Sequence, residues 1–217
     1  MYINQEKYLL LSEQLQQKEV VLVAVSKIHP AQAIQELYNL GQRDFGENYV
    51  QELLAKQEVL PKDIRWHFIG HLQSNKVKYI APFIHLIHGV DSFKLLKEIS
   101  RQGVKNERVI EVLLQVHIAT EETKFGLDEA ELAGIMNAEK NSPLPGIRIR
   151  GLMGMASFSD DLNLVRSEFK FLKGLFDKYF KNDDILSMGM SSDYGLALEL
   201  GSTMVRIGSL IFGKRDG

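Results

Sequence analysis

Short apolar segments alternate with amphipathic helical segments along nearly the whole chain, and this alternation limits the folds available to it. Strand character is found at residues 20–25, 44–46, 66–69, 86–90, 109–116, 147–153, 185–188 and 204–207, and helical patterns at 31–40, 50–58, 76–81, 92–102, 128–137, 161–179 and 194–200. Repeated strand–helix units return the chain to the same edge of a sheet, so the strands are parallel. Eight such strands predict an α/β protein with a closed (β/α)8 TIM barrel, and an open doubly wound sheet is the alternative.

The composition is typical of a globular protein without a nucleic-acid or membrane partner. The chain has 217 residues, a net charge of −2 and no cysteine, so we expect no basic surface, no disulfide and no thiolate metal site. Its N-terminus lacks the pattern of a signal peptide, and no apolar stretch approaches the ~20 residues that span a membrane. These features predict a cytoplasmic protein.

Residues 1–217 are expected to form one domain, in which an extra helix at 5–17 precedes the first strand. Tyr8, Leu11 and Leu15 share one face of that helix, which should pack against the barrel or cover its N-terminal mouth. Because no appended domain is expected, we predict a monomer.

The first predicted strand leads into Ser26 and Lys27. Residues 20–25 are all apolar, which is typical of a strand buried on both faces. Ligands of α/β barrels lie at the C-terminal ends of such strands. Desolvation there would lower the pKa of Lys27, and its amine could then form a Schiff base. A lysine at a strand end can also simply reach water, and the strand alone does not decide between these interpretations.

The loops that follow the last two strands contain glycine and serine. Barrel enzymes frequently bind phosphate with these loops and a short helix N-terminus. We therefore predict that the Ser191 hydroxyl and the amides of Gly208 and Ser209 bind phosphate, although each loop could equally be a simple turn. The chain contains no GxxxxGK[ST] loop and no GxGxxG fingerprint, so neither a nucleoside triphosphate nor a dinucleotide is indicated.

A phosphate site beside a reactive lysine fits two ligands, namely pyridoxal 5′-phosphate or the phosphorylated sugar of a class I aldolase. Arg206, in the last strand, favours the first, because an arginine there could donate a hydrogen bond to the pyridine nitrogen. Since arginine stays protonated, it would not protonate the ring, which would then be a weaker electron sink. A structural ion pair is the alternative role for Arg206.

No other residues predict a catalytic or metal site. His67, within the third strand, is interpreted as a buried, hydrogen-bonded histidine, and the histidine spacing predicts no metal. The acidic pairs at 121–122 and 160–161 are typical of solvated or helix-capping positions. Lys124 is interpreted as an exposed loop residue.

The motifs at the strand ends resemble those of the pyridoxal phosphate homeostasis proteins. The resemblance runs over nearly the whole chain, in the family's order, and rests on AVSK (24–27), FGENYVQE (45–52), WHFIG (66–70) with LQSNK (72–76), RGLM (150–153), GMS (189–191) and GSTMVRIG (201–208) with IFG (211–213). It implies a fold type III barrel like the alanine racemase N-terminal domain, with pyridoxal phosphate held as an aldimine by Lys27.

The same resemblance implies roles for further residues. Asn48 would lie beside the cofactor ring and Arg206 would face the pyridine nitrogen. The phosphate contacts would be Ser191, Gly208 and Ser209. Lys124 matches a family lysine associated with a secondary cofactor contact or with transfer. The N-terminal helix is short and the link between the fourth and fifth strands is trimmed, but neither departure touches a cofactor motif.

The function implied is a carrier or regulator of the intracellular pyridoxal phosphate pool, with no catalytic residue, whose partners are the cofactor and apo-enzymes that use it. The alternative is a pyridoxal phosphate-dependent amino-acid racemase or decarboxylase. Racemisation requires proton transfer on both faces of the cofactor, and we expect no second domain after Gly217 to supply the second base. A class I aldolase is a third, weaker alternative.

Overall fold

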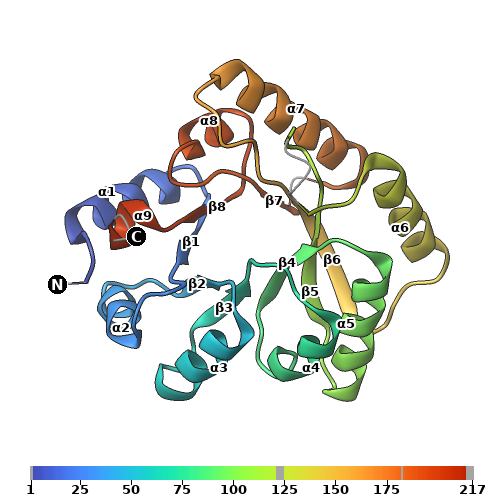
Figure 1. Ribbon diagram of the computed structural model, residues 1–217, viewed down its shortest axis with the longest axis horizontal. Coiled ribbons are helices and arrows are strands. Elements are labelled where there is room, and N and C mark those ends of the chain that lie inside the picture. The colour runs from blue at the N-terminus through green and yellow to red at the C-terminus, as the bar shows by residue number, and fades with distance from the viewer. Residues whose placement is uncertain (1, 121–124, 182, 214–217) are drawn as a thin grey trace.

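The computed structural model describes residues 2–120, 125–181 and 183–213, and its centre is a closed barrel of parallel strands (Figure 1). The strands are β1 (Val21–Val25), β2 (Asp44–Glu47), β3 (Arg65–Phe68), β4 (Leu86–Val90), β5 (Ile110–Gln115), β6 (Ile147–Met153), β7 (Ile185–Ser187) and β8 (Met204–Ile207). Each strand pairs with the next, and β8 pairs with β1. The predicted barrel is confirmed, and the open sheet is wrong.

Helices surround the barrel in Figure 1; α1 precedes the first strand, and the others follow the strands in turn. They are α1 (Gln5–Gln16), α2 (Ala31–Asn39), α3 (Val50–Val59), α4 (Val77–Ile80), α5 (Phe93–Lys105), α6 (Glu129–Asn141), α7 (Leu162–Tyr179), α8 (Tyr194–Glu199) and α9 (Ser209–Phe212). A 3-10 turn, η1 (Ser74–Lys76), precedes α4, so the helix expected at 76–81 is split. Sequence reasoning missed α9, because four residues are too few to show a helical period.

The apolar residues form two separate cores. The smaller consists of Val23, Leu86, Leu113, Met153 and Met204. Their neighbours along the same strands, such as Ala24 and Ile87, belong to the larger core. Because successive side chains of a strand point to opposite faces, the smaller core lies inside the barrel and the larger one lies between strands and helices.

Three of the longer helices begin at a side chain that caps them. Ser92 accepts a hydrogen bond from the amide of Leu95 at the start of α5, and Asp128 forms a capping box with Glu131 at the start of α6. Asp161 caps α7, which confirms the capping interpretation of that acidic residue. Such caps satisfy amides that the helix leaves unpaired, so each helix begins at a defined point after its strand.

The N-terminal helix packs against the wall of the barrel. Tyr8, Leu11 and Leu15 are its buried residues, as predicted. The helix contacts β1 and α9, and the Asn4 amide donates a hydrogen bond to the Ile211 carbonyl at 2.7 Å. The first and last described helices therefore lie side by side (Figure 1). None of the described helices is long and apolar enough to cross a membrane.

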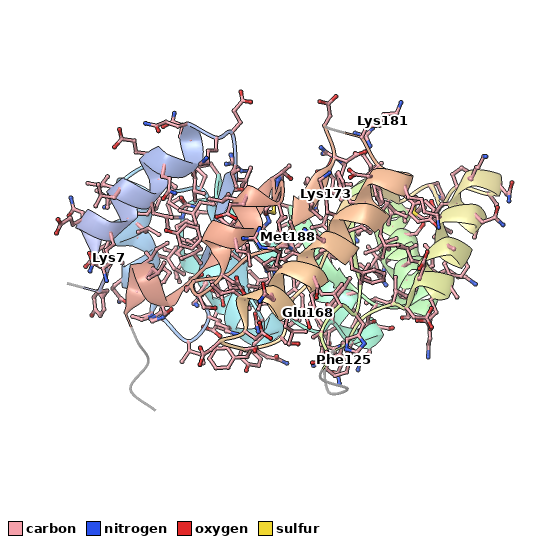
Figure 2. The ribbon with its side chains drawn as sticks, turned by 90° about the horizontal axis from the view of Figure 1, so that it is seen from above. Lys7, Phe125, Glu168, Lys173, Lys181 and Met188 are labelled. Carbon is pink, nitrogen blue, oxygen red and sulfur yellow. The ribbon has the colours of Figure 1, made fainter. Side chains whose placement is uncertain are left out.

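Figure 2 shows the barrel from the side and separates its two ends. Phe125, which follows β5, lies at the lower edge, and Lys181, which precedes β7, lies at the upper edge. The lower edge is therefore the C-terminal mouth, where barrels of this kind bind their ligands.

Candidate functional site at the mouth of the barrel

All six predicted site residues line one pocket at the C-terminal mouth. The pocket has a volume of about 650 Å³, which is within the range of small-molecule sites. The predicted residues are Lys27, Asn48, Ser191, Arg206, Gly208 and Ser209. The remaining lining residues, which sequence reasoning missed, are Val25, Ile69, Met155, Phe158, Met190, Ser192 and Leu210. Most of these lie just beyond strand ends, so their positions follow from the barrel once its register is known.

Lys27 lies between a buried residue and a strained one. Ser26 is fully buried, and its hydroxyl donates a hydrogen bond to Glu47 Oε1 at 2.6 Å. Ile28 has a φ of +69°, a left-handed conformation that a β-branched residue rarely adopts. The Ile28 amide donates to Glu52 Oε1 at 2.5 Å, and this bond holds the unusual turn. The backbone on both sides of Lys27 is therefore fixed by α3 and β2.

A cluster of ion pairs among Lys56, Glu47 and Glu52 contacts this turn. Lys56 Nζ lies 2.7 Å from Glu47 Oε1 and 2.6 Å from Glu52 Oε1. Burial raises the pKa of Glu47 to about 7, and the neighbouring Lys56 opposes that rise. The second carboxylate oxygen of Glu47 is buried without a hydrogen-bond partner among the described residues. No simple motif marked this cluster in the sequence, although Glu52 and Lys56 have the i, i+4 spacing of a helical pair.

Arg206 brings a buried cation to the pocket. Its Nη1 donates to Ser187 Oγ at 2.6 Å and its Nη2 donates to the Gly154 carbonyl at 3.1 Å. Burial lowers the pKa of Arg206 to about 10, and Asp193 opposes the effect, so the guanidinium stays charged at neutral pH. Among the described residues, no carboxylate lies within salt-bridge distance of Arg206, and the alternative of a structural ion pair is not supported.

Ser191 and Gly208 meet across the loops after β7 and β8. The Gly208 amide lies 3.4 Å from Ser191 Oγ, and Ser209 begins α9 directly afterwards. Gly189 has a φ of +96°, and a Cβ there would lie 2.7 Å from the Cβ of Ala197. Glycine is therefore needed for the β7 loop to turn back toward Ser191. The two loops that were predicted to bind phosphate lie together at one wall of the pocket.

Asn48 follows β2, and its backbone lies close to that of Gly70. Its Oδ1 is buried and has no hydrogen-bond partner among the described residues. A Cβ on Gly70 would lie 2.7 Å from the Asn48 carbonyl oxygen and 3.0 Å from its Cα. The absence of a side chain at Gly70 therefore allows the ends of β2 and β3 to approach each other beneath Asn48.

Glu168 holds two loops of the mouth together. This buried α7 side chain accepts hydrogen bonds from the amide and the hydroxyl of Ser157 at 2.7 and 2.6 Å, and from the Thr120 amide at 3.2 Å. Figure 2 shows Glu168 toward the same edge as Phe125. Its role was missed because the pattern of α7 indicates a helix but not which of its carboxylates turns inward.

His67 is buried and hydrogen-bonded at both ring nitrogens, as expected for an interior histidine. Together with Asp44 and His85 it forms a group whose ligand atoms are close enough for a cation. However, Arg65 donates to both carboxylate oxygens of Asp44, and a guanidinium there opposes a metal ion. We interpret Asp44 and Arg65 as an ion pair to which His67 is hydrogen-bonded, and the absence of a metal stays a prediction. Lys124 and the acidic pair at 121–122 lie outside the described residues.

Comparison with known proteins gives the class of fold. Over residues 5–216 the chain matches the family described as alanine racemase, N-terminal domain. The alanine racemase of Bartonella henselae, solved with covalently bound pyridoxal phosphate, is 18% identical with a TM-score of 0.71, over 99% of this chain and 62% of that one. At this identity the likeness concerns the fold alone. The molecule is a barrel of the alanine racemase N-terminal type.

Closer relatives narrow this class. The pyridoxal phosphate homeostasis protein of Aquifex aeolicus is 41% identical over 199 residues, which are 89% of this chain and 86% of the relative. PipY of Synechococcus elongatus, solved with PLP bound, is 38% identical with a TM-score of 0.86, over 96% of this chain and 99% of PipY. The chain belongs to the family of pyridoxal phosphate homeostasis proteins.

Proposed function

We propose that this protein binds pyridoxal 5′-phosphate in the mouth pocket and regulates the supply of that cofactor without turning over a substrate. The observation that carries the proposal is the meeting of three chemical groups in one cavity. Lys27 offers an amine to an aldehyde, Arg206 offers a cation to a ring nitrogen, and the Ser191–Gly208 wall offers hydroxyl and amide donors to a phosphate.

The residues present fit this group. Asn48 Oδ1 is a buried acceptor without a partner among the described residues, which a polar ligand atom would satisfy. The apolar side chains of Val25, Ile69 and Leu210 supply a surface for a flat ring. When bound, the cofactor supplies an aldehyde that reacts with primary amines and a ring that withdraws electrons.

Each site residue has a distinct task in this proposal. Lys27 anchors the ligand from a turn that Ser26 and Ile28 hold rigid. Arg206 stays protonated, so it donates a hydrogen bond to the ring nitrogen but transfers no proton to it. Ser191 and the amides of Gly208 and Ser209 bind the phosphate by hydrogen bonds, with no lysine or arginine required at that wall.

The pocket favours a carrier over a racemase. Among the described residues that line it, Lys27 and Arg206 are the only titratable side chains. Racemisation needs proton exchange on two faces of the substrate carbon, and an arginine does not release its proton at neutral pH. We also propose that the recipients of the cofactor are apo-enzymes that use it.

The absorbance spectrum of the protein with added pyridoxal phosphate tests the proposal. We expect a visible band that survives dialysis, and transfer of the cofactor to an apo-enzyme added in a second step. Incubation with a panel of L-amino acids should give no chiral inversion and no decarboxylated product beyond a protein-free control. A protein that gains no band would contradict binding, and rapid turnover of any amino acid would contradict the carrier role.

A further inference from the structure

A chain of hydrogen bonds runs through the barrel interior from the mouth toward the N-terminal end. Arg206 Nη1 lies 2.6 Å from Ser187 Oγ, and Ser187 Oγ lies 3.4 Å from His88 Nδ1. His88 Nε2 is 2.9 Å from His67 Nδ1, and His67 Nε2 is 2.9 Å from Asp44 Oδ1. All five residues are buried. Because the interiors of such barrels are mostly apolar, this polar chain requires an explanation.

Arg206 and Asp44, at the two ends of this series of hydrogen bonds, determine which atom is the donor in each bond between them. Arginine can only donate, so Ser187 Oγ accepts from Arg206 and has one proton left to give. At the other end, Asp44 is ionised and can only accept. Burial alone would raise its pKa, but hydrogen bonds from Arg65 and His67 outweigh burial and lower it to about 2.

One proton arrangement satisfies all of these constraints. Ser187 donates to His88 Nδ1, His88 donates through Nε2 to His67 Nδ1, and His67 donates through Nε2 to Asp44. Both imidazoles are then neutral and carry their proton on Nε2. If His88 gained a second proton, its Nδ1–H would face Ser187 Oγ, and the Ser187 proton would lose its acceptor.

The charges around His88 favour the neutral ring. Arg206 on β8 is a cation, and His67 on β3 and His85 on β4 would each add positive charge if they were protonated. The carboxylate of Asp44 is hydrogen-bonded to His67. Burial first, and then His67, Arg206 and His85, lower the pKa of His88 well below its ordinary value. His88 is therefore a permanent acceptor toward Ser187 at physiological pH.

We propose that His88 is a positioning residue for the cofactor, because it orients the Ser187 hydroxyl that holds one edge of the Arg206 guanidinium. The Gly154 carbonyl holds another nitrogen of the same group, so both contacts together fix the plane that Arg206 presents to the pocket. This inference rests on the proposed function, in which Arg206 meets the ring nitrogen. His88 is linked to Arg206 through two hydrogen bonds and sets the geometry of the contact between Arg206 and the ring nitrogen.

The proton arrangement can be tested in the protein without cofactor. Nitrogen-15 spectra of the imidazole groups should show His88 neutral from pH 6 to pH 8, with its proton on Nε2. A proton on Nδ1 of His88, or a doubly protonated ring in this range, would overturn the inference, because Ser187 would then have no acceptor in His88.

Three substitutions separate positioning from simple packing. His88→Asn keeps an acceptor near the Nδ1 position, His88→Gln keeps a donor near the Nε2 position, and His88→Leu keeps neither. Because an unanchored arginine must be ordered when the ligand binds, we expect the Gln and Leu variants to raise the Kd for pyridoxal phosphate about three- to tenfold. Both should also shift the absorbance band of the bound cofactor, whereas the Asn variant should stay close to the wild type in both measurements.

The matched control is His85→Gln, which changes an exposed histidine beside His67 that is not part of the chain of hydrogen bonds. It should leave the Kd and the band unchanged. If the Asn and Leu variants are equally impaired, or if none of the three differs from the wild type, His88 does not position Arg206. If the wild-type protein itself binds no pyridoxal phosphate, the proposed function fails first and this inference fails with it.

Discussion

The ammonium group of Lys56 lies 2.8 Å from the carbonyl oxygen of Ser26, the residue that immediately precedes Lys27. Lys56 thus supports the backbone at the end of β1, directly before Lys27. Lys56 is buried and paired with Glu47 and Glu52, whereas Lys27 lines the pocket. The two amines should therefore differ sharply in reactivity.

Borohydride reduction in the presence of pyridoxal phosphate should attach one pyridoxyl group, at Lys27. Lys27→Ala should abolish the adduct, because Lys56 is buried, paired with Glu47 and Glu52, and not among the residues that line the pocket. Peptide mass mapping makes the measurement, with Lys78→Ala, which changes an exposed lysine on α4, as the control. An adduct on Lys56 or a full-strength adduct in the Lys27→Ala protein would contradict this assignment.

Arg206→Gln should weaken cofactor binding about ten- to a hundredfold, as expected for the loss of a hydrogen bond from a charged donor. Fluorescence titration or equilibrium dialysis gives the Kd. Arg166→Gln changes a half-buried arginine that pairs with Glu199 outside the pocket and should leave the Kd unchanged. Equal Kd values for the two variants would show that Arg206 does not meet the ligand.

Ionised Asp44 should contribute to the free energy of unfolding, and this contribution should be lost at acidic pH. Its pKa is held at about 2 against an ordinary value of 3.8, so the unfolded chain takes up the proton first as pH falls. The contribution is complete above about pH 4 and disappears as pH approaches 2, and it amounts to about 2 kcal/mol. The free energy of unfolding, measured by urea titration at several pH values, should fall more steeply in the wild type than in Asp44→Asn. Parallel curves would show that Asp44 has no such role.

Glu47 should have the opposite pH dependence. Because burial raises its pKa to about 7 from an ordinary value of 4.5, the folded protein binds the proton more tightly than the unfolded chain between these values. Stability should therefore fall as pH rises from about 4.5 to 7, then level off. Glu47→Gln keeps an oxygen for Ser26 and Lys56 but does not titrate, so its unfolding free energy should lack this decline. A decline of the same size in both proteins would assign it to another group.

Gly70→Ala should reduce both stability and cofactor binding. The new Cβ would lie 2.7 Å from the Asn48 carbonyl oxygen, and relieving that contact should cost about 1–3 kcal/mol and displace Asn48. Gly134→Ala on α6 is the matched control, since nothing lies within 4 Å of its Cβ position. That change should stabilise the protein by up to about 1 kcal/mol. The prediction fails if Gly70→Ala unfolds at the same denaturant concentration as the wild type.

The sequence predicted the strands well, because their apolar runs are visible without knowledge of the fold. Strands β4, β6 and β8 have the predicted bounds, and the others differ by one residue at one or both ends. The short helix α9 escaped detection, because it lacks a repeat and depends on the loop after β8 for its place. The mouth residues were found because the ends of parallel strands converge at one edge of a barrel.

The partners of these residues could not be predicted. Ser187 and His88 are 99 positions apart in the chain, and they meet only because β4 and β7 face each other across a closed barrel. His67 was recognised as a buried histidine, but its partners were not, since His88 and Asp44 come from neighbouring strands whose register is set by the whole sheet. Contacts across the barrel depend on closure, which no local pattern encodes.

The hydrogen bond from Asn4 to Ile211 joins the N-terminal helix to α9, which begins at Ser209 in the proposed phosphate wall. Stacking of His29 on Phe212, with ring centroids 4.6 Å apart, ties the segment after Lys27 to that same short helix. The helix at the start of the chain and the segment after Lys27 are therefore both attached to the short helix at one wall of the pocket. We therefore expect substitutions that break this attachment to shorten the time for which the cofactor stays bound, even though they change no residue that lines the pocket.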